Sequence, residues 1–201
     1  MKPATVTLAM TGASGSEYAL RLFECCLQSG VHVQFITSQP GQIVLGMETE
    51  LKLTGSPQKM RQQFASYFDA DAEQISVYSR DQWTAPPASG SSVADAMVVC
   101  PCSMGSLASI AVGSSDNLIH RAADVAIKER KTLILVPRET PFSSIHLENM
   151  LKLSRLGVVI LPPNPGFYHG IGKVSDLVDF IVARILDQLG IDNDLSPRWG
   201  R

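Results

Sequence analysis

Residues Thr5 to Gly15 read Thr-Val-Thr-Leu-Ala-Met-Thr-Gly-Ala-Ser-Gly, a strand-like apolar run that leads directly into a turn of small residues. A helical pattern of apolar residues begins straight after this turn, at Tyr18. Glycine lets the backbone of such a turn approach a ligand, and the free N–H groups at the start of a helix favour an anion. We therefore expect a nucleotide or flavin phosphate at residues 12–15. A tight turn that binds nothing is the alternative.

Apolar runs and helical patterns alternate along the rest of the chain. The further strand candidates are residues 31–37, 75–78, 96–100, 132–137 and 158–161. Continuous apolar strands separated by helices are typical of a parallel sheet that is covered on both faces. The sequence predicts an α/β protein with a three-layer Rossmann/flavodoxin-like fold and a mostly parallel, doubly wound sheet. We expect a single domain over residues 1–190 and a tail, 191–201, that packs on the active site or on a neighbouring subunit.

Two local details can be predicted as well. Residues 39–45 form a helical pattern that contains Pro40 and Gly41, so we expect this helix to be short or frayed. Asp116 precedes a helical pattern that runs to about Arg130, and we expect it to cap this helix.

Composition excludes several classes of function. The chain has 201 residues, of which 45% are hydrophobic and 18% charged, and its net charge is −2. No broad basic surface is expected, which argues against binding to nucleic acid or to an anionic membrane. No apolar run approaches the roughly 18–20 residues that span a bilayer, and the cytoplasm is the expected location. The four cysteines have no zinc-ligand spacing, so we expect no metal and buried, reduced thiols.

The fold class predicts where a ligand binds. In parallel α/β sheets the ligand lies beyond the carboxyl ends of the strands. The segments that follow the predicted strands are the turn at 12–15, Ser38, the loop at 102–106, Arg138 with Glu139, and the loop at 162–172. These segments are expected to form one site.

A mononucleotide with one phosphate fits this site better than a dinucleotide. The third glycine of a dinucleotide-binding turn is absent, because Tyr18 stands near its position. The second strand ends at Ser38 rather than at an acidic residue that would hold an adenosine ribose. No Tyr-x-x-x-Lys pair for reductase chemistry is present.

Four basic residues suggest a second phosphate beside that of the nucleotide. They are Arg121, Lys128, Arg138 and Arg184. Arg121 and Lys128 are seven residues apart on one predicted helix and so lie nearly on one face. Arg184 is surrounded in sequence by apolar residues, where a simple surface charge is less expected. Trp83 and Trp199 lie in breaker-rich segments and could form a wall for an apolar or cationic substrate, although a role in the core is equally compatible.

Several short motifs together resemble the UbiX-type flavin prenyltransferases, in particular the bacterial members that end in Pro-Arg-Trp. The motifs are Thr-Gly-Ala-Ser-Gly (11–15), Glu-Thr-Glu (48–50), Pro-Pro-Ala-Ser-Gly-Ser (86–91), Cys-Pro-Cys-Ser (100–103), Asn-Leu-Ile-His-Arg-Ala-Ala-Asp-Val-Ala-Ile-Lys-Glu-Arg (117–130), Val-Pro-Arg-Glu-Thr-Pro (136–141), His-Leu-Glu-Asn-Met (146–150) and Pro-Gly-Phe-Tyr-His (165–169). The resemblance covers essentially the whole chain. The stretch Gln39-Pro40-Gly41 departs from the usual Ser-Lys-Ala-Ala pattern, although Ser38 is kept.

The resemblance implies a metal-independent transferase with FMN as its co-substrate. Such enzymes join the dimethylallyl group of dimethylallyl monophosphate to reduced FMN, at N5 and then at C6. Their product, prenylated FMN, is passed to UbiD-type decarboxylases, as in ubiquinone synthesis, and a flavin reductase supplies the reduced FMN. Most members are homo-oligomers of twelve subunits. The expected partners are therefore further copies of the chain, together with the UbiD-type decarboxylase and the flavin reductase.

The resemblance also assigns roles to residues. FMN would be bound by Gly12, Ala13, Ser14, Ser38, Ser103, Met104, Gly105, Ser106 and Arg138. The allyl phosphate would be bound by Ser89, Gly90, Arg121, Lys128, Glu139, Tyr168 and Arg184, partly across a subunit interface, with Trp83 and Trp199 as an aromatic wall. Ser14, Glu48, Lys128 and Glu139 are the catalytic candidates.

Two other functions stay open at this point. One is a flavin-dependent decarboxylase of the phosphopantothenoylcysteine type, although the only early histidine, His32, is inside a predicted strand and no Pro-x-Met-Asn segment occurs. The other is a flavin carrier without chemistry. The sequence does not distinguish a monophosphate donor from a diphosphate donor.

Overall fold

The computed structural model describes residues 2–167, 170, 172–198 and 200, and a six-stranded sheet lies at its centre. The strands are β1 (Thr5–Met10), β2 (His32–Thr37), β3 (Ile75–Tyr78), β4 (Ala96–Cys102), β5 (Thr132–Pro137) and β6 (Val159–Ile160). Their order is β3-β2-β1-β4-β5-β6, and every pair is parallel. The predicted α/β fold is confirmed, and the sheet is parallel throughout the described part of the chain.

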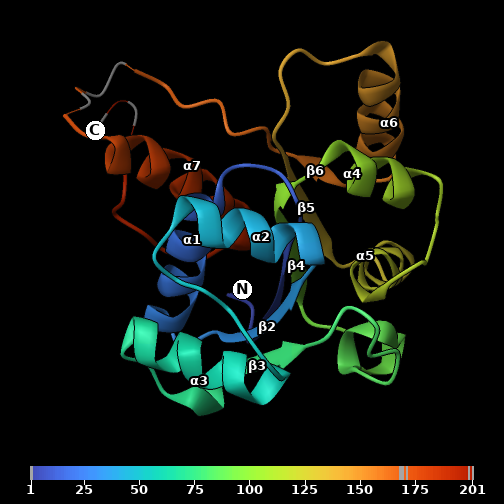
Figure 1. Ribbon diagram of the computed structural model, residues 1–201. Helices are drawn as coiled ribbons and strands as arrows, with labels where there is room; N and C mark the ends of the chain where they lie inside the picture. The colour runs from blue at the N-terminus through green and yellow to red at the C-terminus, as the bar shows by residue number, and fades with distance from the viewer. Residues whose placement is uncertain (1, 168–169, 171, 199, 201) are drawn as a thin grey trace.

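Helices cover both faces of the sheet, which makes three layers (Figure 1). The helices are α1 (Ser16–Gln28), α2 (Gln39–Glu48), α3 (Pro57–Phe68), α4 (Met104–Ala111), α5 (Leu118–Lys128), α6 (Ser144–Arg155) and α7 (Val174–Leu189), with short 3-10 turns at Ala72–Gln74, Pro86–Ala88 and Gly90–Ser92. One buried cluster joins the sheet to α1, α3 and α7, and a second joins it to α4, α5 and α6. No described helix is both long and apolar enough to cross a bilayer.

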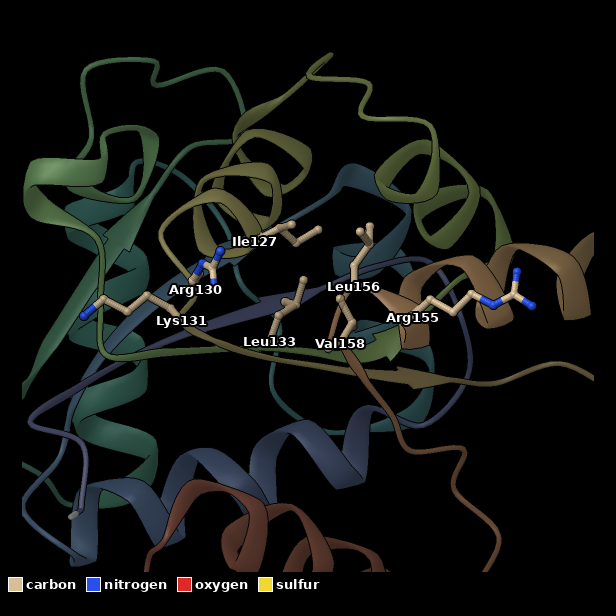
Figure 2. Close-up of a pocket in the computed structure, with 8 residues that line it drawn as sticks. Ile127, Arg130, Lys131, Leu133, Arg155, Leu156 and Val158 are labelled. Atoms are coloured by element: carbon tan, nitrogen blue, oxygen red, sulfur yellow. The ribbon is translucent and has the colours of Figure 1, made fainter.

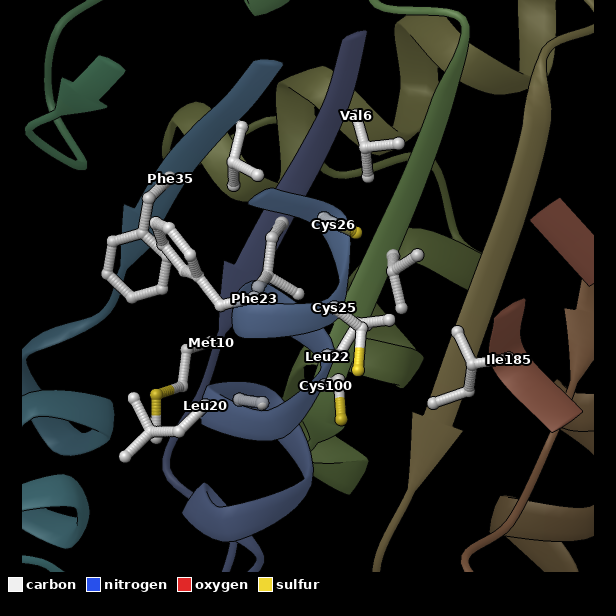
Figure 3. Packing of buried hydrophobic residues seen from close by; sticks show 14 of the residues in the cluster. Val6, Met10, Leu20, Leu22, Phe23, Cys25, Cys26, Phe35, Cys100 and Ile185 are labelled. Atoms are coloured by element: carbon white, nitrogen blue, oxygen red, sulfur yellow. The ribbon is translucent and has the colours of Figure 1, made fainter. Parts of the chain in front are cut away.

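The central strand β1 shows why the strands are apolar on both sides. Val6, Leu8 and Met10 belong to the first buried cluster, whereas Ala9 belongs to the second. Successive side chains of a strand point to opposite faces, so a strand covered twice needs apolar residues at nearly every position. Figure 3 shows the first cluster, in which Phe23 of α1 lies between the strands and the neighbouring helices.

The strand order places the turn after β1 at the middle of the sheet. The chain leaves β1 for β2 on one side and later enters β4 on the other side. The reversal of direction lies at the carboxyl ends of β1 and β4, and α/β proteins bind their ligands at such a position. The predicted position of the site at the carboxyl edge therefore agrees with the topology.

Two local predictions were wrong. Helix α2 is not frayed but runs over Gln39–Glu48, because Pro40 lies in its first turn, where no backbone N–H is needed. Helix α5 is capped by Asn117 rather than by Asp116. The Asn117 side chain accepts the backbone N–H groups of Ile119 at 2.9 Å and His120 at 3.1 Å.

Candidate functional site

Hydrogen bonds tie together the segments that follow β1, β2, β4 and β5. The hydroxyl of Thr11 donates to the carbonyl oxygen of Pro101 at 2.9 Å and accepts the backbone N–H of Ser103 at 2.8 Å. The backbone N–H of Ser38 donates to the end of β1 at 3.0 Å, and that of Arg138 donates to the end of β4 at 3.3 Å. The structure therefore brings these predicted cofactor-binding segments to one edge. Sequence reasoning gave Thr11 no role, since its position alone does not reveal the bridge.

The turn after β1 is shaped by glycine. A Cβ atom on Gly12 would lie 2.4 Å from the Cβ atom of Pro40, so no larger residue fits there without a shift of α2. Gly15 has a φ of 122°, a conformation that other residues rarely adopt. Gly12 and Ser14 face the solvent, whereas Ala13 is buried. Ala13 can therefore serve a ligand only through its backbone.

The carboxylate of Glu48 lies against the start of α1. It accepts the backbone N–H of Gly15 at 3.0 Å and that of Ser16 at 2.8 Å. The N-cap residue of α1, Gly15, has no side chain to do this, so Glu48 replaces the missing cap. A ligand phosphate was expected at residues 12–15, but the anion that the structure places at this helix end is the protein's own carboxylate.

The same contacts set the charge of Glu48. Burial favours the neutral acid, but hydrogen bonds from the Ser14 side chain and from the backbone of Ser16 and Gly15 outweigh this effect. Together they hold the pKa of Glu48 below its ordinary value. Glu48 is therefore ionised at neutral pH, which is the form in which a carboxylate can accept a proton.

Two further helices begin at the carboxyl edge with a serine cap. The Ser38 hydroxyl accepts the backbone N–H of Gly41 at 3.0 Å at the start of α2. The Ser103 hydroxyl accepts the backbone N–H of Ser106 at 3.3 Å at the start of α4 and donates to its hydroxyl at 3.1 Å. The serines thus orient helix ends, which favour an anionic ligand.

The first turn of α4 is open on one side and closed on the other. No atom lies within 4 Å of the position that a Cβ atom on Gly105 would take, so a ligand can approach its backbone. Met104 is only 9% exposed and belongs to the second buried cluster. Its side chain is part of the core, and only its backbone is available to a cofactor.

Arg138 and Glu139 line a cavity of about 330 Å³ at the carboxyl ends of β5 and β6. Its walls are formed by Pro137, Arg138, Glu139, Thr140, Pro141, Phe142, Pro162, Pro163 and Asn164. Glu139 accepts the backbone N–H of Thr140 at 3.1 Å. Arg138 is exposed, and no described residue forms an ion pair with it. Its guanidinium group is therefore available to an anion.

A second group of predicted residues gathers where α5 meets the loop at 86–92. Arg121 donates from Nε to the carbonyl oxygen of Ala88 at 3.1 Å. Lys128 forms an ion pair with Glu129 beside Gly90, where a Cβ atom would lie 2.9 Å from the Lys128 Nζ atom. The two basic residues thus face the same loop, as their spacing on the helix predicts. Ser89, in this loop, bonds to Ser91 at 3.0 Å.

Within a single chain, Lys128 does not lie at the carboxyl edge of the sheet. Lys128 is the last residue of α5, shortly before β5 begins at Thr132, whereas Arg138 follows the other end of β5. A strand rises about 3.3 Å per residue, so the length of β5 separates the two edges by about 20 Å. Lys128 and Arg138 therefore belong to opposite ends of the sheet within one chain.

Arg184 is not held in an apolar environment, contrary to the expectation from its neighbours in sequence. Its side chain is 54% exposed and pairs with Asp187 at 2.7 Å. The apolar residues around it in sequence face the core, because the period of the helix turns Arg184 to the outer side.

The described part of the C-terminal tail packs against its own domain. Asp187 also binds Arg198 at 2.8 Å and accepts a hydrogen bond from Asn193 at 3.3 Å. Ile191 is buried, and Leu195 packs against the first buried cluster. Contact of the tail with a neighbouring subunit stays a prediction.

Three of the predicted phosphate-binding residues have acidic partners that sequence reasoning did not consider. The pairs are Arg121 with Asp124, Lys128 with Glu129 and Arg184 with Asp187. Two of them have i,i+3 spacing on a helix, which is visible in the sequence. Any phosphate that binds there competes with these carboxylates.

Three aromatic candidates remain. Trp83 is 49% exposed, so it is a surface residue with room to contact a partner. Tyr168 and Trp199 lie outside the described residues.

The cysteines lie in the core rather than at the carboxyl edge surface. All four cysteines are buried and unpaired, and burial raises the pKa of Cys102 to about 12 and that of Cys25 to about 11. Within the described ranges, no group of three or more His, Cys, Asp or Glu side chains is placed to hold a metal ion.

Comparison with known proteins gives the family. Residues 1–186 match the family model described as Flavoprotein. The flavin prenyltransferase UbiX of Pseudomonas aeruginosa is 58% identical over 198 residues, which covers 98% of this chain and 95% of that protein. The similarity to relatives of this name extends over nearly the whole chain and is not confined to one motif.

Two solved structures have the same fold. The structure of AnUbiX (PadA1) in complex with FMN and dimethylallyl pyrophosphate has a TM-score of 0.86 and 38% identity, and the match covers 98% of this chain and 97% of that one. A dodecameric FMN-dependent UbiX-like decarboxylase from Escherichia coli O157:H7 has a TM-score of 0.85 and 37% identity, with coverage of 98% and 100%. On this evidence, the chain belongs to the UbiX family of flavin prenyltransferases.

Proposed function

We propose that this protein transfers the dimethylallyl group of dimethylallyl monophosphate to reduced FMN, at N5 and then at C6, and so makes prenylated FMN. Membership of the flavin prenyltransferases supports this reaction. The observation that carries the proposal is the ionised carboxylate of Glu48, which is held beside Ser14 at the switch point of the sheet.

The carboxyl edge fits a flavin mononucleotide. Gly12 allows close approach to the turn, and Gly105 leaves the first turn of α4 open. Ser103 and Ser38 hold the starts of α4 and α2, whose N–H groups suit a phosphate. Arg138 adds a positive charge at the same edge that no described residue pairs with. Reduced FMN, when bound, supplies the two nucleophilic positions of the reaction.

Proton transfer falls to Glu48, Ser14 and Glu139. Glu48 carries a negative charge at neutral pH and can accept the proton that is lost when the new ring closes. The Ser14 hydroxyl bonds to Glu48 and fixes the carboxylate beside the turn. Glu139 lies next to Arg138 in the cavity at the end of β5 and can assist from that side.

The positive charges that stabilise the departing phosphate come in part from a second copy of the chain. Arg121 and Lys128 face the loop that holds Ser89 and Gly90, and Lys128, at the end of α5, lies away from the carboxyl edge of its own sheet. A neighbouring copy in a homo-oligomer, which we propose to be a dodecamer, would bring such a surface to this edge. Arg184, Tyr168, Trp83 and Trp199 are the further donor-binding candidates. Cations placed on the leaving group lower the barrier to cleavage of the C–O bond.

The proposal includes the partners that this chemistry needs. A UbiD-type decarboxylase would take up prenylated FMN, and a flavin reductase would supply reduced FMN. These partners, and the cytoplasm as their common location, remain expectations from the sequence.

Anaerobic incubation tests the proposal. The full chain is mixed with reduced FMN and dimethylallyl monophosphate, and the flavin is extracted for mass analysis. We expect the flavin mass to rise by one prenyl unit. Parallel samples contain the diphosphate donor, no donor, or oxidised FMN, so that the preferred donor is measured in the same experiment. An unchanged flavin mass with both donors, while FMN is bound, would refute the proposal.

The decarboxylase alternative is weaker for a structural reason. His32, the only early histidine, begins β2 at the amino edge of the sheet and bonds to Ser76 of β3 at 2.9 Å. It cannot act at the carboxyl edge of its own chain. A pure flavin carrier is disfavoured by the family, because relatives of this chain are named flavin prenyltransferases. Binding of FMN without any binding of allyl phosphate would favour the carrier.

A further inference from the structure

A pocket of about 520 Å³ lies at the amino edge of the sheet, opposite the proposed flavin site. It is lined by Ile127, Arg130, Lys131, Leu133, Arg155, Leu156, Gly157 and Val158. These residues come from two connections, the one between α5 and β5 and the one between α6 and β6. The pocket therefore sits between the starts of two neighbouring strands.

The centre of the pocket is apolar. Leu133 and Val158 are 1% and 5% exposed and form its floor, and Leu156 is 57% exposed beside them. Figure 2 shows the side chains of Ile127, Leu133, Leu156 and Val158 gathered in the middle of the pocket. An exposed leucine over a buried apolar floor offers a surface for hydrocarbon.

The rim of the pocket is positively charged. In Figure 2, Lys131 and Arg155 extend to opposite sides of the apolar centre, and Arg130 lies beside Ile127. No hydrogen bond or ion pair to another described residue holds the charged end of Arg130 or Arg155. The acidic residue nearest to Arg130 in the sequence is Glu129, which does not line the pocket. It forms an ion pair with Lys128, and its interaction with Lys131 is electrostatic, without direct contact.

The backbone conformation of Arg130, at the rim of the pocket, is strained. Its φ is 54°, in the left-handed region that glycine usually occupies at the end of a helix. A non-glycine residue is strained there, so a useful side chain is one physical reason for an arginine at this position.

We propose that this pocket binds a small organic phosphomonoester with a hydrocarbon tail. The phosphate dianion would lie at the rim beside Arg130 and Lys131, which Figure 2 shows on one side of the apolar centre, and the tail would cover Leu133 and Val158. The volume lies within the range of small-molecule sites, and a phosphate dianion has a charge for each of the two cations, whereas a carboxylate has only one. The inference is separate from the proposed prenyl transfer, because none of the residues that line this pocket is assigned to the flavin site or the donor site.

Calorimetric titration of the full chain with hexyl phosphate tests the inference. Inorganic phosphate and hexanol are titrated in parallel, because each carries only one half of the proposed ligand. We expect saturable binding of hexyl phosphate that is about tenfold or more tighter than that of either half. The double substitution R130Q/K131Q should weaken it by about tenfold or more. L156S should weaken hexyl phosphate but leave inorganic phosphate unchanged.

The matched control is K152Q, which removes an exposed charge of α6 that does not line the pocket. Its affinity for hexyl phosphate should stay within about twofold of the unsubstituted chain. Equal binding by the unsubstituted chain and R130Q/K131Q would overturn the inference. The absence of saturable binding would also overturn it, and smaller assemblies of R130Q/K131Q in light scattering would then show that another copy of the chain closes the pocket.

Discussion

The carboxylate of Glu48, the last residue of α2, accepts the backbone N–H of Ser16, the first residue of α1, at 2.8 Å. This bond links the two helices that border the turn after β1. It stabilises the start of α1 and keeps the carboxylate ionised next to the expected flavin. The structural role of Glu48 and its proposed catalytic role therefore belong to one side chain.

Replacing Glu48 by glutamine separates these two roles. Glutamine can still accept a backbone N–H but cannot take up a proton, so E48Q should lower kcat by about 100-fold or more. We expect the dissociation constant of FMN to change by less than about threefold. Flavin mass analysis gives the rate, and fluorescence quenching gives the affinity. E50Q, which removes an exposed charge two residues away, is the control. A loss of FMN binding in E48Q without a loss of turnover would contradict the assigned role.

Glu48 should also make stability depend on pH in a defined direction. Its pKa in the folded chain is below its ordinary value of 4.5. Its contribution to the free energy of unfolding is therefore complete above about pH 5 and is lost as the pH falls through the folded pKa. The difference in Tm between the unsubstituted chain and E48Q should be larger at pH 7 than at pH 3. The effect is limited to a few tenths of a kcal/mol, about that of a partly exposed charge. A difference in Tm that grows as the pH falls would contradict this prediction.

Gly12→Ala should disturb the site through α2. The added methyl group would lie 2.4 Å from the Cβ atom of Pro40, which is part of a rigid ring. We expect a loss of about 1–3 kcal/mol in the free energy of unfolding, as in other overpacked positions, and weaker binding of FMN. Gly46→Ala is the matched control on α2, because the nearest atom to its Cβ is 3.9 Å away. Urea unfolding compares the two variants, and equal stability of both would show that Pro40 yields freely.

We expect Arg138 to contribute to the binding of the ligand but not to the stability of the fold. Since no described residue pairs with it, R138Q should leave Tm within about 1 °C, as expected for a surface substitution. Loss of a charge-assisted contact should weaken FMN binding by about tenfold. Thermal unfolding and a fluorescence titration measure the two effects, with K152Q as the surface control. Unchanged FMN affinity would remove Arg138 from the binding site.

Two inactive variants should restore activity when they share an assembly. K128Q changes the surface that we assign to the neighbouring copy, and E48Q changes the carboxyl edge. In co-expressed mixtures about a quarter of the sites would combine an intact edge with an intact neighbouring surface. The mixture should therefore regain measurable prenyl transfer. The homogeneous variants serve as controls, and a mixture no more active than they are would place Lys128 and Glu48 in the same chain's site.

Much of the fold follows from the sequence because two-sided burial leaves a clear pattern. The strand Thr5–Met10 and its parallel neighbours are apolar at nearly every position, and a parallel sheet of this kind predicts the carboxyl edge as the site. The helix α2 was misjudged because a proline in the first turn does no harm there. Arg184 was misjudged because apolar neighbours in sequence do not share its side of the helix.

The contacts of the site are harder to predict than its position. The bond between Glu48 and Ser16 joins residues that are 32 positions apart, and only the packing of α2 on the turn creates it. The ion pair of Arg121 with Asp124 is different, because its i,i+3 spacing could be read from the sequence. Local spacing is visible in a single sequence, whereas contacts between distant segments require the fold.

Transfer of an isotopic label tests the central claim most directly. Dimethylallyl monophosphate with deuterated methyl groups is incubated anaerobically with the protein and reduced FMN, and the extracted flavin is analysed by mass spectrometry. The account predicts that the flavin gains one prenyl unit that carries all of the deuterium, and that E48Q forms little of this product in the same time. An extracted flavin that carries no deuterium, from protein that has FMN bound, would contradict the account.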